Sequence, residues 1–496
     1  MTLTTFNQRW PLVLTAAALI GLAIGLVGPT ATSQAATAQQ TSCDWDWDSA
    51  GRAATELFHT ASAMDTDKHH LYIYGGVDGS FAPQNTVERG DFSGQDASAT
   101  NSRISAGGAL NRIGAAGAYR AKGADSDDSA VYFVGGLGDP QGGQADGDIQ
   151  KYATKAGSWS KTSATVSDRF FATATYVPEQ DAIWVIGGVT QCALPDVLGG
   201  ATCQARSLAT QYITFDDMTG EPVVNTLSGA NVSNFAHSAV YDSTAKRILV
   251  FGGTNDISRG NSDLVALDVS DPDPSKAKFT TVASSGRAPR VFFHSAAFDP
   301  GRNMMIVNGG VSQGFLASNE STENKTYGLD LAATTPTWMD MGTSLQDRVA
   351  GVMEWDANHG VAIYTLGRKK YNGNPMQPQN VVRTSHGLIC TEVQPTATPG
   401  PTNTPAPTRT PGGPGGSTDP WMPPSPEFES CPQLQGRVPD AAVQAALGNP
   451  PSSPMLCNPN VPIGPTNLYR DKLSLQDNNK PYHPIFNRLQ WKCGCQ

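Results

Sequence analysis

The stretch Leu71-Tyr72-Ile73-Tyr74-Gly75-Gly76 decides the fold, because the chain repeats it. It is a short apolar run that ends in two glycines. Four further intact copies follow, and a sixth, degenerate copy has lost its first glycine; they begin at Val131, Ile183, Ile248, Ile306 and Ile363. The copies start 52 to 65 residues apart, and a repeat of this period indicates an array of equivalent structural units.

A strand of small residues lies about ten residues before each glycine pair, for example at 172–176 and 238–241. The turn between the two strands begins with aspartate in several units, as at Asp242 and Asp299. Aspartate suits this position because its carboxylate accepts hydrogen bonds from backbone amides further along the turn. Each unit is therefore predicted to begin with an antiparallel hairpin.

The run before each glycine pair is apolar at consecutive positions, which is typical of a strand buried on both faces. A weaker strand follows each polar loop, and it contains Tyr152, Tyr212, Leu267 or Tyr327. A fourth strand has a tryptophan in two units, Trp159 and Trp338. Four strands in a unit of roughly 50–60 residues make one blade of a β-propeller. We predict an all-β, six-bladed propeller.

An apolar run, two glycines, and then tyrosine and tryptophan together resemble the kelch repeat, and the spacing of Tyr152 and Trp159 is typical of it. The resemblance covers residues 43–392 and implies a six-bladed kelch-type β-propeller. The sequence departs from the pattern in two ways. The second repeat has an insertion at 121–128, and the first, fourth and sixth repeats lack a clear tryptophan.

The two ends of the propeller segment predict how the ring closes. The sequence Cys43-Asp44-Trp45-Asp46-Trp47 resembles a fourth strand but precedes the first hairpin. Residues 381–390 resemble a third strand with no tryptophan strand after it. We expect the N-terminal strand to complete the last blade and Cys43 to be disulfide-bonded to Cys390. Cys192 and Cys203 flank one loop, and we expect them to pair locally.

Residues 1–38 are predicted to be a signal peptide, with Arg9 before an apolar run over 12–27 and small-x-small cleavage sites after it. A retained N-terminal anchor is the alternative. Cleavage would leave a secreted or cell-surface protein with no inserted segment. Export would also place the eight cysteines in an oxidising compartment, where disulfides persist.

The chain after the propeller divides into two further segments. Residues 393–427 are rich in proline and threonine and are predicted to be an extended, semi-rigid linker. Residues 428–496 are predicted to form a small C-terminal module held by two disulfides, with three connectivities open. Its cysteines are Cys431, Cys457, Cys493 and Cys495. Zinc binding by Cys493, Cys495 and His483 is the alternative; otherwise we expect no metal and no cofactor.

Composition and charge narrow the function. The 51 glycines and the charged fraction of 16% fit a turn-rich β protein. The net charge of −10 argues against a nucleic-acid partner. We interpret the basic residues 368–370 as a solvated loop rather than a phosphate site.

Candidate ligand-binding residues lie just before the first strand of several units. Equivalent positions gather at one end of the channel, so four arginines there would form a cationic ring suited to a carboxylate or sugar acid. The alternative is that these arginines and neighbouring histidines brace adjacent blades, and their recurrence with the repeat favours it. The candidates are Arg112, Arg169, Arg290, Arg348, His59, His237 and His294.

The resemblance also raises the question of catalysis, because galactose oxidase is a kelch-like propeller. Its copper site needs two tyrosines, two histidines and a cysteine cross-linked to tyrosine, and the sequence shows no such set. A sialic acid mutarotase-like enzyme is similar in fold, but its catalytic residues cannot be matched here. We therefore predict an exported, non-catalytic recognition or scaffold protein that binds an extracellular glycan or protein through one propeller face. An enzyme acting on a sugar or sugar acid at the channel mouth is the alternative.

Overall fold

The computed structural model describes residues 42–393 except 125, 139–143, 194–201, 204–207, 230 and 375–378. The chain divides into two units, Met1–Ala397 and Thr398–Gln496, and all described residues belong to the first. The predicted signal peptide, the C-terminal module with Cys431, Cys457, Cys493 and Cys495, and all but the first residue of the linker lie outside the described residues. Those predictions stay predictions. Within the described part of the chain, no helix is both long and apolar enough to cross a membrane.

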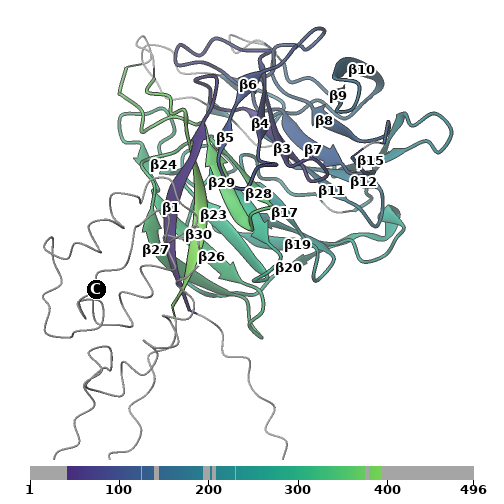
Figure 1. The fold of residues 1–496 in the computed structure, drawn as a ribbon. Helices are drawn as coiled ribbons and strands as arrows, with labels where there is room; N and C mark the ends of the chain where they lie inside the picture. Colours follow the sequence, from purple (N-terminus) through teal and green to yellow (C-terminus); the bar gives the residue numbers. More distant parts are fainter. Residues whose placement is uncertain are drawn as a thin grey trace, which may run out of the picture. The chain divides into compact units, whose positions relative to one another are not determined.

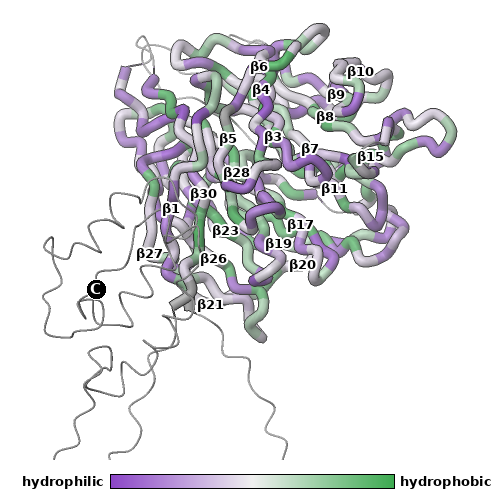
Figure 2. Tube along the Cα trace, viewed as in Figure 1, coloured by the Kyte–Doolittle hydropathy of each residue, from purple (hydrophilic) through white to green (hydrophobic). Residues whose placement is uncertain are grey.

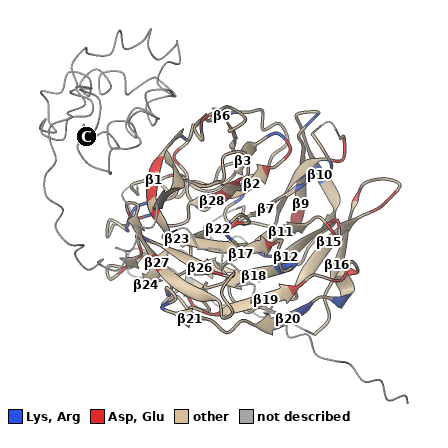
Figure 3. Ribbon diagram, turned by 60° about the horizontal axis from the view of Figure 1, so that its bottom comes forward, with Lys and Arg blue, Asp and Glu red and all other residues tan. Residues whose placement is uncertain are grey.

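Six sheets, each with four main strands, form the six blades of a propeller. The innermost strand of each blade packs beside that of the next blade, and the sixth packs beside the first, which closes the ring. Figure 3 shows these strands gathered around the centre. The innermost strands are β2 (Ala61–Asp65), β7 (Ala116–Arg120), β11 (Thr173–Val177), β17 (Ser238–Asp242), β22 (Ser295–Asp299) and β28 (Val352–Asp356). The prediction of an all-β, six-bladed propeller is confirmed.

The second strand of each blade is the apolar run before the glycine pair. These strands are buried along nearly their whole length; β8, for example, is buried at every position. Figure 2 shows hydrophobic residues running through the interior, as along β23. The second strands are β3 (His70–Tyr74), β8 (Ala130–Val134), β12 (Ala182–Ile186), β18 (Arg247–Phe251), β23 (Met304–Asn308) and β29 (Val361–Thr365).

The third and fourth strands continue each blade outward. The third strands are β4 (Val87–Asp91), β9 (Asp148–Ala153), β15 (Gln211–Phe215), β19 (Leu264–Asp268), β26 (Lys325–Asp330) and β30 (Thr384–Val393). The fourth strands are β6 (Ser102–Arg103), β10 (Ser158–Thr165), β16 (Pro222–Thr226), β20 (Lys278–Thr281), β27 (Thr337–Ser344) and β1 (Ser42–Arg52). Trp159 and Trp338 lie on fourth strands as predicted, and each pairs with the preceding strand of its blade.

The ring closes through the N-terminal strand, as the sequence predicts. Strand β1 pairs antiparallel with β30, so blade 6 combines the two ends of the propeller segment (Figure 1). Cys43 and Cys390 form a disulfide, and so do Cys192 and Cys203 on the paired short strands β13 (Cys192–Ala193) and β14 (Thr202–Cys203).

Additional short elements extend this plan. Two-residue strands β5 (Ala99–Thr100) and β21 (Ser285–Gly286) pair in parallel with the outermost strands β1 and β27. A small hairpin, β24 (Val311–Gln313) with β25 (Ser321–Thr322), follows the fifth glycine pair. A 3-10 turn, η1, covers Pro274–Lys276.

The turns between first and second strands follow the predicted aspartate rule. The carboxylates of Asp65, Asp242, Asp299 and Asp356 each accept a backbone N–H from two or three residues further on. All four are buried. These turns lie at the end of the channel opposite the glycine pairs, so the two ends have different chemistry.

Candidate functional sites at the two ends of the channel

A closed ring of backbone hydrogen bonds surrounds the channel near the glycine pairs. One residue just before each innermost strand takes a left-handed conformation, with φ between 53° and 60°. Each N–H donates to the equivalent carbonyl of the neighbouring blade at 2.8–3.0 Å, and the sixth bond returns to the first blade. We call these residues the collar: His59, Gly114, Phe171, Ala236, Phe293 and Ala350.

Aromatic side chains close the channel at the collar. His59, Phe171 and Phe293 point inward and contact one another with ring centroids 4.6–4.8 Å apart. Phe315, from the loop after β24, packs on His59 and Phe293. Burial, with a smaller effect of Arg368, holds the pKa of His59 well below its usual value, so the ring is neutral. We call these four side chains the floor.

Three of the four candidate arginines are buried beside the collar and hydrogen-bonded within their own blades. Arg169 donates to the carbonyls of Gly187 and Ala209, at 3.2 and 3.0 Å. Arg348 donates to the carbonyls of Leu366 and Thr384, at 2.8 and 3.0 Å. Each guanidinium therefore ties the start of the first strand to the end of the second and the start of the third.

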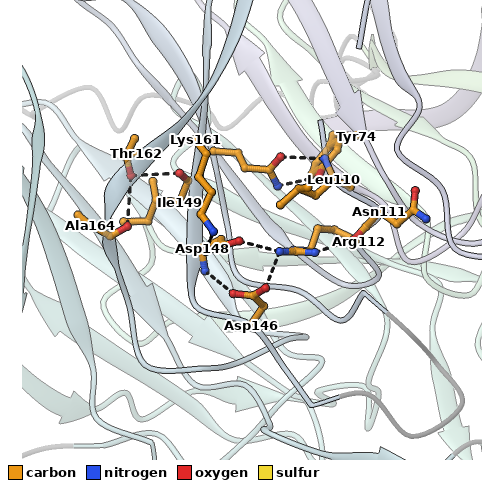
Figure 4. A network of polar contacts seen from close by, with 11 residues as sticks. Tyr74, Leu110, Asn111, Arg112, Asp146, Asp148, Ile149, Lys161, Thr162 and Ala164 are labelled. Atoms are coloured by element: carbon orange, nitrogen blue, oxygen red, sulfur yellow. Dashed lines mark hydrogen bonds and ion pairs between the residues drawn. The ribbon is translucent and has the colours of Figure 1, made fainter. Parts of the chain in front are cut away.

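Arg112 has a different set of partners in blade 2. Its Nη2 lies 2.6 Å from Asp146 and 2.9 Å from Asp148, and Lys161 also reaches Asp148. Figure 4 shows this arrangement, with the arginine directed at both carboxylates. Its positive charge is thus compensated inside the blade.

Arg290 does not occupy the position of the other three. Val291 precedes Phe292 and the collar residue Phe293, where Arg169 precedes Phe170 and Phe171, so Arg290 lies one residue too early. It is exposed, whereas the others are buried. The structure therefore does not bring the four guanidinium groups together in one ring, and ligand binding by these arginines remains a prediction.

His237 and His294 lie one residue beyond the collar and hydrogen-bond across blade boundaries. The Nε2 of His237 lies 3.2 Å from Thr173 Oγ1, and that of His294 lies 2.9 Å from Ser238 Oγ. Burial lowers the pKa of His237 to about 4 and that of His294 to about 3. Both are therefore neutral imidazoles at physiological pH, next to the floor.

Beyond these histidines the channel widens into a cavity of about 530 Å³. All six innermost strands line it, mostly with alanine, glycine, serine and threonine, and it reaches the turns at the far end. Among the described residues that line it, Glu354 is the one carboxylate, and there is no lysine or arginine.

Glu354 was not a candidate at the sequence level. Ser62 Oγ donates to its Oε1 at 2.7 Å, and burial raises the pKa of the carboxyl to about 7. One signal in the sequence could have identified it: Glu354 is charged, whereas the residues at the equivalent position of the other five blades are small or apolar. Those residues are Ala63, Ala118, Thr175, Val240 and Ala297.

The loops after the glycine pairs lie at the collar end of the channel, away from the hairpin turns, and hydrogen bonds join them to one another. Gly260 donates to Ser312 O at 2.9 Å, and Gly314 donates to Ser258 O at 3.0 Å, so the loops of blades 4 and 5 are joined. Gln379 donates to Gly79 O at 2.7 Å, which joins the loops of blades 6 and 1. These bonds order the loop surface.

The interpretation of residues 368–370 as a solvated loop is wrong for Arg368. Its guanidinium is fully buried and forms two hydrogen bonds, of 2.8 and 2.6 Å, to the equally buried carboxylate of Glu320. Lys369 and Lys370 are exposed. The sequence did not show this pair because its acid comes from the loop of another blade.

No family model matches the chain, and no curated protein matches it. Solved structures do match. One of them, described as "Structure of YjhT", is 16% identical with a TM-score of 0.49, over 68% of this chain and 99% of that chain. The six-bladed architecture rests on the strand pairing above, and membership of the kelch family remains a prediction.

Proposed function

We propose that this chain is an exported recognition or scaffold protein whose propeller binds an extracellular glycan or protein through the face formed by the post-glycine loops. The observation that carries the proposal is the collar with the loops fastened above it. A closed ring of backbone hydrogen bonds supplies rigidity, and cross-blade bonds fix the loops on it. Long loops on a rigid scaffold are a common place for binding residues.

Two further observations support this assignment. Both disulfides of the described residues would persist in an oxidising compartment, which supports export. Arg290 is exposed beside the loop that contains Gly260, so it is available to a ligand at this face. The geometry does not favour the enzyme alternative with an arginine ring, because Arg112, Arg169 and Arg348 are buried and bonded within their blades.

Binding of the exported chain to a glycan array and to extracellular proteins tests the proposal. We expect saturable binding without chemical change of the ligand, and Arg290→Ala should weaken it about tenfold. Arg287→Ala is the matched control, because Arg287 is also exposed but follows the outer strand β21. Turnover of a bound sugar, or equal effects of the two substitutions, would contradict the proposal.

A further inference from the structure

The cavity that contains Glu354 is a second candidate site, separate from the loop face. The floor and the collar lie between them, so a ligand in the cavity does not reach the post-glycine loops. The cavity volume of about 530 Å³ lies within the range of small-molecule sites. Its opening lies at the hairpin turns, where no candidate residue was predicted.

The charge distribution in the cavity is one-sided. Glu354 supplies a carboxyl group, while no cationic side chain among the described lining residues balances it. The other titratable groups of the lining are His237 and His294, which burial keeps neutral, and the tyrosines at the opening. A carboxylate in such surroundings is stabilised by a cation, and an anionic ligand is disfavoured.

Aromatic rings surround the opening of the cavity. Three are tyrosines whose hydroxyls are held by acids: Tyr119 donates to Asp67, Tyr176 to Asp181 and Tyr241 to Glu179. Because the hydroxyls are engaged, the rings are held in place at the opening, and Trp355 and Phe298 are among the lining residues there. An organic cation at the opening would lie near these rings, and aromatic ring faces attract cations.

We propose that the channel cavity binds a small organic cation, an amine or amino sugar, whose ammonium group pairs with the Glu354 carboxylate. The hydroxyl of Ser62 orients that carboxylate, and the small side chains of the innermost strands leave room for the ligand body. The aromatic residues line the end of the cavity through which the ligand enters. Since the carboxyl has to be ionised to form the pair, binding releases a proton wherever the free protein holds Glu354 protonated.

Calorimetry of the exported chain with matched sugars tests this proposal. Glucosamine, glucose and glucuronate differ in charge on nearly the same body. At about pH 7, where the amine of glucosamine is mainly an ammonium group, we expect glucosamine to bind at least about tenfold more tightly than glucose, and glucuronate to bind more weakly than either. Ethanolamine and putrescine extend the series to amines without a ring.

Two substitutions connect the binding to the carboxylate. Glu354→Gln keeps the shape and can still accept from Ser62, and it should remove the preference for glucosamine over glucose. Glu221→Gln is the control, because Glu221 is exposed on the β15–β16 hairpin.

Two results would overturn the proposal. One is equal affinity for glucosamine and glucose with no effect of Glu354→Gln. The other is the absence of binding by every amine at about 1 mM.

Discussion

Cys43 and Cys390 are joined by a disulfide across the last blade, although 347 residues separate them in the sequence. The two strands that contain them, β1 and β30, also pair over ten residues each. The bond therefore fixes the point where the ring closes. In the unfolded chain it would close a loop that contains almost the whole propeller.

The size of that loop predicts the stabilisation. In the chain-entropy model, the Cys43–Cys390 bond should contribute about 3 kcal/mol more than the Cys192–Cys203 bond, which closes a loop with a separation of 11 residues. We expect Cys43→Ser with Cys390→Ser to lower the free energy of unfolding by more than Cys192→Ser with Cys203→Ser. Denaturant unfolding of the two double variants measures this. Equal losses would show that strand pairing alone holds the ring.

The first glycine of each pair gives a second prediction. Gly187 has a φ of +63°, and a Cβ on it would lie 2.4 Å from Asn234 O and 2.5 Å from His237 Cε1. An alanine in the left-handed conformation costs roughly 1–2 kcal/mol even where nothing clashes with it. Gly187→Ala should therefore lower the free energy of unfolding by more than that amount. Gly220→Ala is the control, because its φ is +69° but its nearest neighbour would be 3.4 Å away. Similar melting temperatures for the two variants would contradict this explanation.

The fold could be predicted because its determinants are local and repeated. Each local motif predicts part of one blade: the glycine pairs, the aspartate turns and the N-terminal strand with Trp45. The repeat period then predicts how many blades the chain forms. The collar escaped prediction for a physical reason. Its six residues share a backbone conformation, not a side chain, so His59 and Ala350 look unrelated in the sequence.

The candidate site could be predicted only in part, because it depends on relationships between blades. Because Arg290 lies near aromatic residues, the sequence suggested that it is equivalent to Arg169. When the blades are aligned on their collar residues, however, Val291 is the residue equivalent to Arg169. The Arg368–Glu320 pair joins two blades that no local motif connects. Glu354 becomes notable only when six strands are placed around one channel.

The buried arginines and Arg290 should respond differently to substitution. Arg169→Met keeps most of the side-chain volume but leaves the carbonyls of Gly187 and Ala209 without their donor. We expect a loss of about 3 kcal/mol in the free energy of unfolding. Arg290→Met should stay within about 0.5 kcal/mol, because the side chain is exposed. A comparable loss for both would mean that Arg290 also braces its blade.

The pH dependence of stability provides a test of Glu354 without any ligand. In the folded protein the pKa of its carboxyl is raised to about 7 from the usual 4.5. Between these values the folded state holds a proton that the unfolded state has released, so stability falls as pH rises from 4.5 to 7. The buried His237 and His294 act in the opposite direction, because their lowered pKa values cost stability as pH falls below 6.5.

Comparison of the wild type with Glu354→Gln isolates the carboxyl from these histidines, since all other groups titrate in both proteins. Glutamine stays neutral at every pH. The free energy of unfolding of Glu354→Gln should therefore exceed that of the wild type only slightly near pH 4, and by about 3 kcal/mol above pH 7. Urea unfolding of both proteins at several pH values measures the difference. Glu221→Gln, at an exposed position, should show no such growth. A constant difference across the pH range would mean that Glu354 is ionised at the same pH in the folded and unfolded chains.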